Sequence, residues 1–174
     1  MISDNDNTKT IFILLTEHKD RVAKLYRFIT GGTYNHVSIG TEGKKFFSFI
    51  TKGFRVEKPW LFAQFKKKEE LCAVYKLNVT EESYNAVKTR IDEFWADKKK
   101  YRYSFIGALL CMLRIPHRFK KQYFCSRFVA EILSESGALE LKKSPSLYQP
   151  NDFTKESQFS ICFQGNLEGL ANAA

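Results

Sequence analysis

The sequence has no apolar run long enough to cross a lipid bilayer. Its longest apolar stretch, from Phe105 to Leu113, has nine residues, whereas a membrane-spanning helix needs about 20. The first residues of the chain are polar and acidic, without the basic and then apolar order of a secretory signal. We therefore expect a cytoplasmic protein with no transmembrane segment.

Cysteine and histidine are scarce, with four and three residues, and they are scattered along the chain. No C-x-x-C pair occurs, and no histidine lies at zinc-site spacing from a cysteine. We therefore expect no metal site and no cofactor. His18 and His117 lie in charged, loop-like segments and are predicted to be surface residues. Three cysteines lie in apolar runs and are predicted to be core thiols: Cys72, Cys111 and Cys162.

Linkers, internal repeats and low-complexity segments are also lacking, which favours one domain over the 174 residues. Hydrophobic residues make up 44% of the chain, and 16 residues are phenylalanine, a composition that excludes a disordered protein. Residues 1–9 and 165–174 are small or polar, and we expect them to be flexible.

Acidic residues are outnumbered, with 19 against 28 lysines and arginines, so the net charge is +9. Such a charge favours contact with anionic surfaces, a phospholipid membrane among them, but it is equally typical of a solvated lysine-rich surface. Tyr101, Tyr103 and Phe105 alternate without an RNA-binding signature, so no specific nucleic acid is expected. The sequence gives no indication of the oligomeric state.

The apolar patterns predict a mixture of strands and helices. Thr80 is the predicted cap of the clearest helix, which reaches Lys98-Lys99-Lys100. The fold class is therefore α+β, an antiparallel sheet packed against helices. The other predicted segments are a strand at 10–15, a helix at 20–29, a hairpin of 35–40 with 44–50, an irregular stretch at 53–64, a buried strand at 71–79, a core helix at 105–113, a helix from Cys125 to Gly137, a loop at 145–153 and a strand at 159–163.

Cys125 occupies the predicted first turn of a helix. Apolar residues at 128, 129, 132 and 133 define the inward face of that helix, and Cys125 lies at the start of the same face. A thiol at a helix N-terminus feels the positive end of the helix dipole, which favours the thiolate. A buried structural thiol is the alternative interpretation.

His36 lies on a predicted strand far upstream. Val37 and Ile39 alternate with it and would anchor the opposite face of the strand in apolar contacts. A cysteine nucleophile needs a histidine as general base and later as acid. Cys125 and His36 are therefore the candidate catalytic pair of a cysteine-dependent enzyme.

Three short motifs carry a resemblance to a known family. These are the segments at 33–39 (TYNHVSI), 123–130 (YFCSRFVA) and 150–153 (PNDF). In their order, with the histidine before the cysteine, they resemble the circularly permuted NlpC/P60 proteins, papain-like thiol hydrolases whose permuted branch includes the lecithin:retinol acyltransferase-like enzymes. The resemblance implies a papain-like fold with Cys125 as nucleophile and His36 as base.

The same resemblance implies a third polar residue, on the strand after the histidine strand, that orients the imidazole. Ser48 is the candidate there, because it is the only short polar residue of that segment. Glu57 is a lesser alternative, and Asn35 would point to the wrong face. The implied reaction is attack of the thiolate on an amide or ester carbonyl, giving an acyl-enzyme, with backbone N–H groups of the Cys125 helix stabilising the oxyanion.

The sequence is compatible with several alternatives. The substrate implied is a small molecule, a lipid-like acyl compound or a peptide. A catalytically silent module that binds lipid or peptide in the same fold is one rival, and a basic adaptor for anionic membranes is another. The stretch Phe105–Leu113, followed by a basic cluster, suits a lipid-facing lip, although a core helix is the preferred interpretation.

Overall fold

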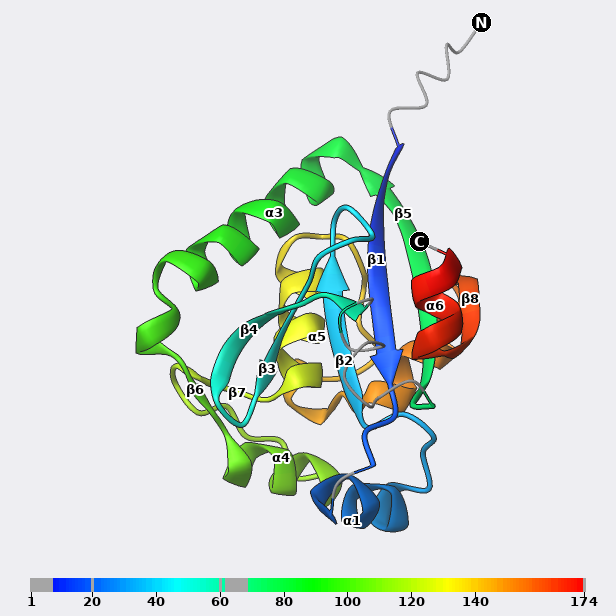
Figure 1. Ribbon diagram of the computed structural model, residues 1–174. Coiled ribbons are helices and arrows are strands. Elements are labelled where there is room, and N and C mark those ends of the chain that lie inside the picture. Colours follow the sequence, from blue (N-terminus) through cyan, green and yellow to red (C-terminus); the bar gives the residue numbers. More distant parts are fainter. Residues whose placement is uncertain (1–7, 20, 60, 62–68, 174) are drawn as a thin grey trace, which may run out of the picture.

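The computed structural model describes residues 8–19, 21–59, 61 and 69–173 and shows a sheet with helices on its faces (Figure 1). The sheet has six strands in the order β4-β3-β2-β1-β5-β8, and each neighbouring pair is antiparallel. The mixed α+β class is thereby confirmed. The strands are β1 (Thr8–Thr16), β2 (His36–Gly40), β3 (Phe46–Ile50), β4 (Gly53–Glu57), β5 (Leu71–Thr80) and β8 (Ser160–Asn166).

Five helices and a small parallel pair of strands complete the described part of the chain. The strand pair joins β6 (Arg102–Tyr103) to β7 (Gln122–Tyr123). The segment predicted as a loop at 145–153 contains two 3-10 turns, Pro145–Leu147 and Pro150–Lys155. The helices are α1 (Arg21–Thr30), α3 (Glu81–Ala96), α4 (Phe105–Met112), α5 (Cys125–Glu135) and α6 (Leu167–Ala173).

The main core lies between the sheet and helices α3 and α5. Alternation along β1 sends Ile11, Ile13 and Leu15 into this core. Rings from three elements, those of Phe49, Phe94 and Phe128, meet there with centroids 5.1 to 5.9 Å apart. Because α5 is buried along almost its whole length, its first residue is held in a fixed position against the sheet.

A second, smaller core covers the opposite face of the sheet. Leu14 of β1 and Leu167 of α6 are fully buried in it. Residues 165–173, which the sequence indicated as a flexible tail, therefore form the end of β8 and helix α6. A single buried leucine, Leu167, packs this short helix against the sheet. One apolar residue is too weak a pattern to predict a helix from the sequence. Thr8 and Lys9 begin β1; residues 1–7 lie outside the described residues.

Two further segments differ from expectation. The stretch predicted to be irregular contains β4, which is paired with β3 along its whole length from Ile50↔Gly53 to Phe46↔Glu57. Gly53 has φ +96°, a conformation that favours glycine. The helix α4 exists as predicted, but it is not a core helix, since only Gly107 and Cys111 are buried along it.

The cap of α3 is confirmed. The Thr80 hydroxyl accepts a hydrogen bond from the Ser83 N–H at 3.2 Å, and Glu81 and Glu82 occupy the first turn. The lysines expected at the end of this helix form a separate 3-10 turn, Lys98–Lys100. Within the described part of the chain, no helix has the length and apolar character needed to cross a membrane.

Candidate active site

Cys125 is the first residue of α5, and the sequence places it there for a clear reason. The apolar residues that follow it at 128, 129, 132 and 133 are all buried. Phe124, the N-cap, has extended backbone and makes no side-chain hydrogen bond to the helix end. The first N–H groups of α5 are therefore not engaged by a capping side chain. Cys125 is buried, with 7% of its surface exposed.

His36 begins β2, at the point where that strand pairs with Thr16 of β1. Val37 and Ile39 lie in the main core, as the alternation predicted. The imidazole of His36 is buried within hydrogen-bonding reach of the Cys125 thiol. Residues 36 and 125, far apart in sequence, are thus brought together because α5 packs on β2.

A carboxylate completes the arrangement. The Oε1 atom of Glu57 lies 2.7 Å from Nε2 of His36, and both side chains are buried. Glu57 is the last residue of β4, which is separated from β2 by β3 in the sheet. Since Nε2 is engaged by Glu57, Nδ1 is the ring nitrogen that remains for the thiol. The order thiol, imidazole, carboxylate is that of a nucleophile, its base and the group that orients the base.

Burial and charge oppose each other at this histidine. Burial by itself would lower the pKa of His36, but the Glu57 carboxylate and the contact with Cys125 raise it to about 10. Burial would likewise raise the pKa of Glu57, yet the imidazolium, with smaller contributions from Ser38 and His18, holds it below its usual value. The pair is therefore an ion pair at neutral pH, and the thiol faces a cationic imidazolium.

Ser48 does not occupy the position expected for the third residue. Its fully buried hydroxyl donates a 2.7 Å hydrogen bond to the carbonyl of Val37, so it ties β3 to β2. The group that contacts the imidazole is Glu57, the lesser alternative. The side chain of glutamate is longer and reaches His36 from β4, a strand that the sequence pattern did not predict.

His18 is a site residue that the sequence analysis missed. It was predicted to be a surface residue, but its ring centroid lies 5.0 Å from that of His36. Its Nδ1 lies 3.0 Å from Oε2 of the buried Glu70, and its backbone N–H donates to Asn35 Oδ1. No sequence signal marked it, because a histidine after a strand end is equally typical of a loop. His117 is exposed, as predicted.

Helix α1 supplies a phenol within electrostatic range of the Cys125 thiol. Burial raises the pKa of Tyr26, and its proximity to the thiols of Cys125 and Cys111 raises it further. The Tyr26 phenol therefore stays neutral at all ordinary pH values and can only donate or share a proton in hydrogen bonds. Helix α1, which carries Tyr26, is in contact with α4.

The remaining cysteines divide into two kinds. Cys72 and Cys111 are buried, as predicted, and burial raises the pKa of each to about 12. Cys162 was predicted to be a core thiol, but β8 is the edge strand of the sheet and leaves it exposed. Burial of part of its side chain still raises the pKa of Cys162.

The segment before His36 is fixed by Asn151 from the second 3-10 turn. Its Oδ1 accepts from the Tyr34 N–H at 3.0 Å, and its Nδ2 donates to the Tyr34 carbonyl. A Cβ at Gly32 would lie 2.0 Å from that amide nitrogen, so this close approach requires glycine. Asn151, part of the third motif, thus acts as a clamp on the chain that enters β2.

We expect Asn151→Ala to lower the free energy of unfolding by about 1–3 kcal/mol, because two buried backbone groups of Tyr34 lose their partners. Urea unfolding followed by circular dichroism measures this. Thr154→Ala, in the same turn, is the control: its exposed hydroxyl bonds only the Asn151 carbonyl, and we expect a change below about 0.5 kcal/mol. Equal effects of the two changes would contradict the clamp.

Among the described residues, no group of three or more His, Cys, Asp or Glu side chains is arranged to hold a metal ion. A comparison with protein-family models finds no match to this chain, and a comparison with the sequences of curated proteins finds none either. The candidate site therefore stands on its geometry: a thiol at a helix start, a buried imidazolium and a buried carboxylate.

Proposed function

We propose that the protein is a cysteine-dependent hydrolase or acyltransferase that attacks an amide or ester carbonyl. The observation that carries the proposal is the buried His36–Glu57 pair, 2.7 Å apart, with the Cys125 thiol against the same imidazole. The order of site residues along the chain, His36 and Glu57 before Cys125, supports a circularly permuted, papain-like NlpC/P60 fold. The substrate is a small molecule, a lipid-like acyl compound or a peptide.

The proposed reaction proceeds in two steps. The thiolate of Cys125 attacks the carbonyl carbon, and the N–H groups at the start of α5 stabilise the oxyanion. His36 gives its proton to the leaving amine or alcohol as the C–N or C–O bond breaks, which leaves an acyl-enzyme. Water or another acceptor, deprotonated by His36, then attacks the thioester and releases Cys125. Glu57 keeps the imidazole oriented and stabilises its charge throughout.

The first test is the rate of alkylation of Cys125 as a function of pH, followed by intact mass. The experiment uses a Cys162→Ser background, which removes the one exposed thiol among the described residues. Iodoacetamide is expected to label one site, with a rate that stays high below about pH 7. In His36→Ala the rate at pH 6 falls by about 100-fold, because the neighbouring cation is lost.

Cys111→Ser in the same background is the matched control, and it leaves the labelling rate unchanged. Slow labelling that is spread over several cysteines and indifferent to His36 would contradict the thiolate–imidazolium pair and favour a binding module. A screen of acyl esters and short peptides follows, in which Cys125→Ala abolishes turnover.

A further inference from the structure

Helix α4 presents its apolar residues to the solvent. Phe105 and Ile106 are each 62% exposed, and Leu109 and Leu113 follow at one-turn intervals, so they form a single stripe. Single exposed leucines are ordinary, but a contiguous apolar stripe marks a contact surface. We call this surface the α4 face; it consists of Phe105, Ile106, Leu109, Leu113 and Ile115.

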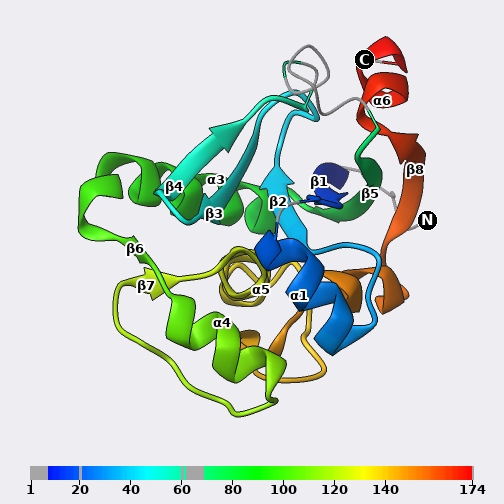
Figure 2. The same cartoon turned by 60° about the horizontal axis from the view of Figure 1, so that its bottom comes forward.

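Helix α1 extends the α4 face. The two helices are in contact, and Figure 2 shows them side by side at the front of the molecule. Phe28 of α1 is 89% exposed, the most exposed large hydrophobic residue of the described chain, and Ile29 is about half exposed. The exposed apolar surface therefore spans two neighbouring helices.

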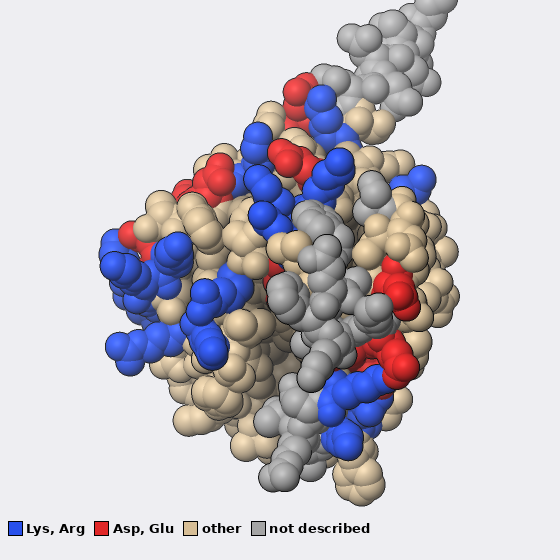
Figure 3. Space-filling model, viewed as in Figure 1, with Lys and Arg blue, Asp and Glu red and all other residues tan. Residues whose placement is uncertain are grey.

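The chain on both sides of α4 is basic. Residues 98–121 contain eight lysines and arginines and no acidic residue, and all eight are exposed. Figure 3 shows one part of this positive charge, a group of Lys and Arg side chains at the left edge, above the tan surface where Figure 1 places α4. We call these residues the basic frame: Lys98, Lys99, Lys100, Arg102, Arg114, Arg118, Lys120 and Lys121.

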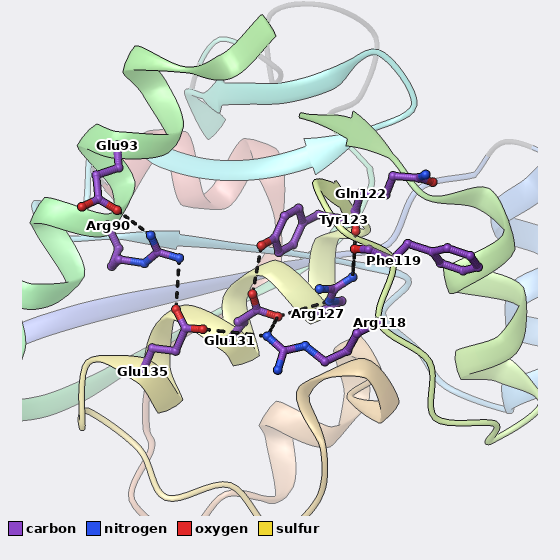
Figure 4. Close-up of polar contacts among 9 residues, drawn as sticks. All are labelled: Arg90, Glu93, Arg118, Phe119, Gln122, Tyr123, Arg127, Glu131 and Glu135. Atoms are coloured by element: carbon purple, nitrogen blue, oxygen red, sulfur yellow. Dashed lines mark hydrogen bonds and ion pairs between the residues drawn. The ribbon is translucent and has the colours of Figure 1, made fainter. Parts of the chain in front are cut away.

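The loop between α4 and β7 is anchored to the core rather than loosely attached. The buried guanidinium of Arg127 on α5 donates to the carbonyls of Phe119 and Gln122, at 3.0 and 2.8 Å (Figure 4). Arg118 reaches the buried Glu131 at 3.3 Å. The basic residues of this loop are thus held at fixed positions beside the α4 face.

We propose that the α4 face and its basic frame dock on an anionic phospholipid surface. Aliphatic and aromatic side chains insert at the boundary between headgroups and acyl chains, while lysines and arginines around them contact lipid phosphates and carboxylates. The charge distribution argues against a second copy of the chain as the partner, because two basic frames would face each other and repel.

The position of α4 links this surface to the candidate site without depending on it. Gly107 on the buried side of α4 lies against Phe124, the residue before Cys125, and the Cys111 thiol bonds the Tyr148 carbonyl. Docking would therefore bring the start of α5 toward the membrane, where an acyl lipid is available. Binding itself requires neither Cys125 nor His36.

The test is co-sedimentation of the full chain with vesicles, either of phosphatidylcholine alone or with about 30% phosphatidylserine. We expect binding to the anionic vesicles only, falling steeply as NaCl rises from about 50 to 500 mM. Leu109→Gln weakens binding by roughly five- to tenfold. Ile161→Gln on β8 is the matched control, because the two side chains are 48% and 49% exposed, and it changes nothing.

A second pair of variants tests the basic frame. Lys99→Gln combined with Lys120→Gln weakens binding by about 30-fold. The control combines Lys76→Gln with Lys88→Gln, two exposed lysines outside the basic frame, and it changes binding less than about twofold. Cys125→Ala binds like the unchanged chain, which separates this proposal from the catalytic one. Three outcomes would each overturn the membrane proposal. The first is equal binding to neutral and anionic vesicles, and the second is control variants that weaken binding as much as the test variants. The third is no vesicle binding together with a dimer that Leu109→Gln dissociates.

Discussion

Glu57→Gln is expected to lower the pKa of His36 from about 10 to below its ordinary 6.5. Burial acts to lower that pKa, and the Glu57 carboxylate is the largest of the influences that raise it. The imidazole of the variant is therefore neutral at pH 7, and the thiol loses its cationic neighbour. Alkylation of Cys125 at pH 6 falls by about 100-fold, because the thiol no longer faces a cation.

Two measurements check this expectation. NMR titration of the imidazole C–H signals gives the pKa of His36 directly, with His18→Asn and His117→Asn used to assign the three histidines. The alkylation profile gives the consequence for Cys125. Ser48→Ala is the matched control, because it removes a buried hydrogen bond to the Val37 carbonyl, costs about 1 kcal/mol of stability and leaves the pKa of His36 in place.

The same ion pair gives the fold a defined dependence on pH. The pKa of Glu57 is lowered, so its stabilising effect is present above the ordinary value of 4.5 and is lost as pH falls through the lower folded value. The pKa of His36 is raised, so its contribution is complete below 6.5 and is lost as pH rises through about 10. Glu57→Gln therefore loses most stability between about pH 5 and 6.5, where both contributions are complete, and the loss shrinks as pH rises toward 10. A variant whose His36 still titrates near 10 would refute the assigned role of Glu57.

Glu131→Leu is expected to have the largest effect on stability, a loss of about 3–5 kcal/mol. Glu131 is buried on α5, where it accepts from the Tyr123 hydroxyl at 2.9 Å and from Arg127 Nε at 3.2 Å (Figure 4). Arg118 also reaches this carboxylate, at 3.3 Å. Removing the carboxylate leaves the guanidinium of Arg127, which is 3% exposed, buried without an ion-pair partner. Urea unfolding measures the loss.

The neighbouring Glu135 provides a control on the same helix. It is exposed and pairs with Arg90 at 3.0 Å and more distantly with Arg118. An exposed ion pair contributes at most about 1 kcal/mol, so Glu135→Leu changes stability by less than that. If Glu131→Leu and Glu135→Leu lower the free energy of unfolding equally, the buried charge of Glu131 does not stabilise α5. Labelling of Cys125 in the folded fraction of Glu131→Leu stays unchanged, because Glu131 lies away from the thiol.

The sequence by itself determined the elements whose signals are local. The apolar spacing after Cys125 predicted α5 and its start, Thr80 with Glu81 and Glu82 predicted the start of α3, and alternation around His36 predicted β2 and its buried face. These predictions succeed because side-chain periodicity and capping chemistry act over a few residues. The same local patterns identified Cys125 and His36 as the candidate pair.

Only the tertiary structure decided which residues meet from different elements. The carboxylate at the imidazole is that of Glu57, which arrives on a strand that the pattern did not reveal, while Ser48 turns to the backbone of β2. His18 lies against His36 because β1 and β2 are neighbours in the sheet. The exposure of α4 likewise depends on how helices pack, since an apolar helix has the same sequence whether it faces the core or the solvent.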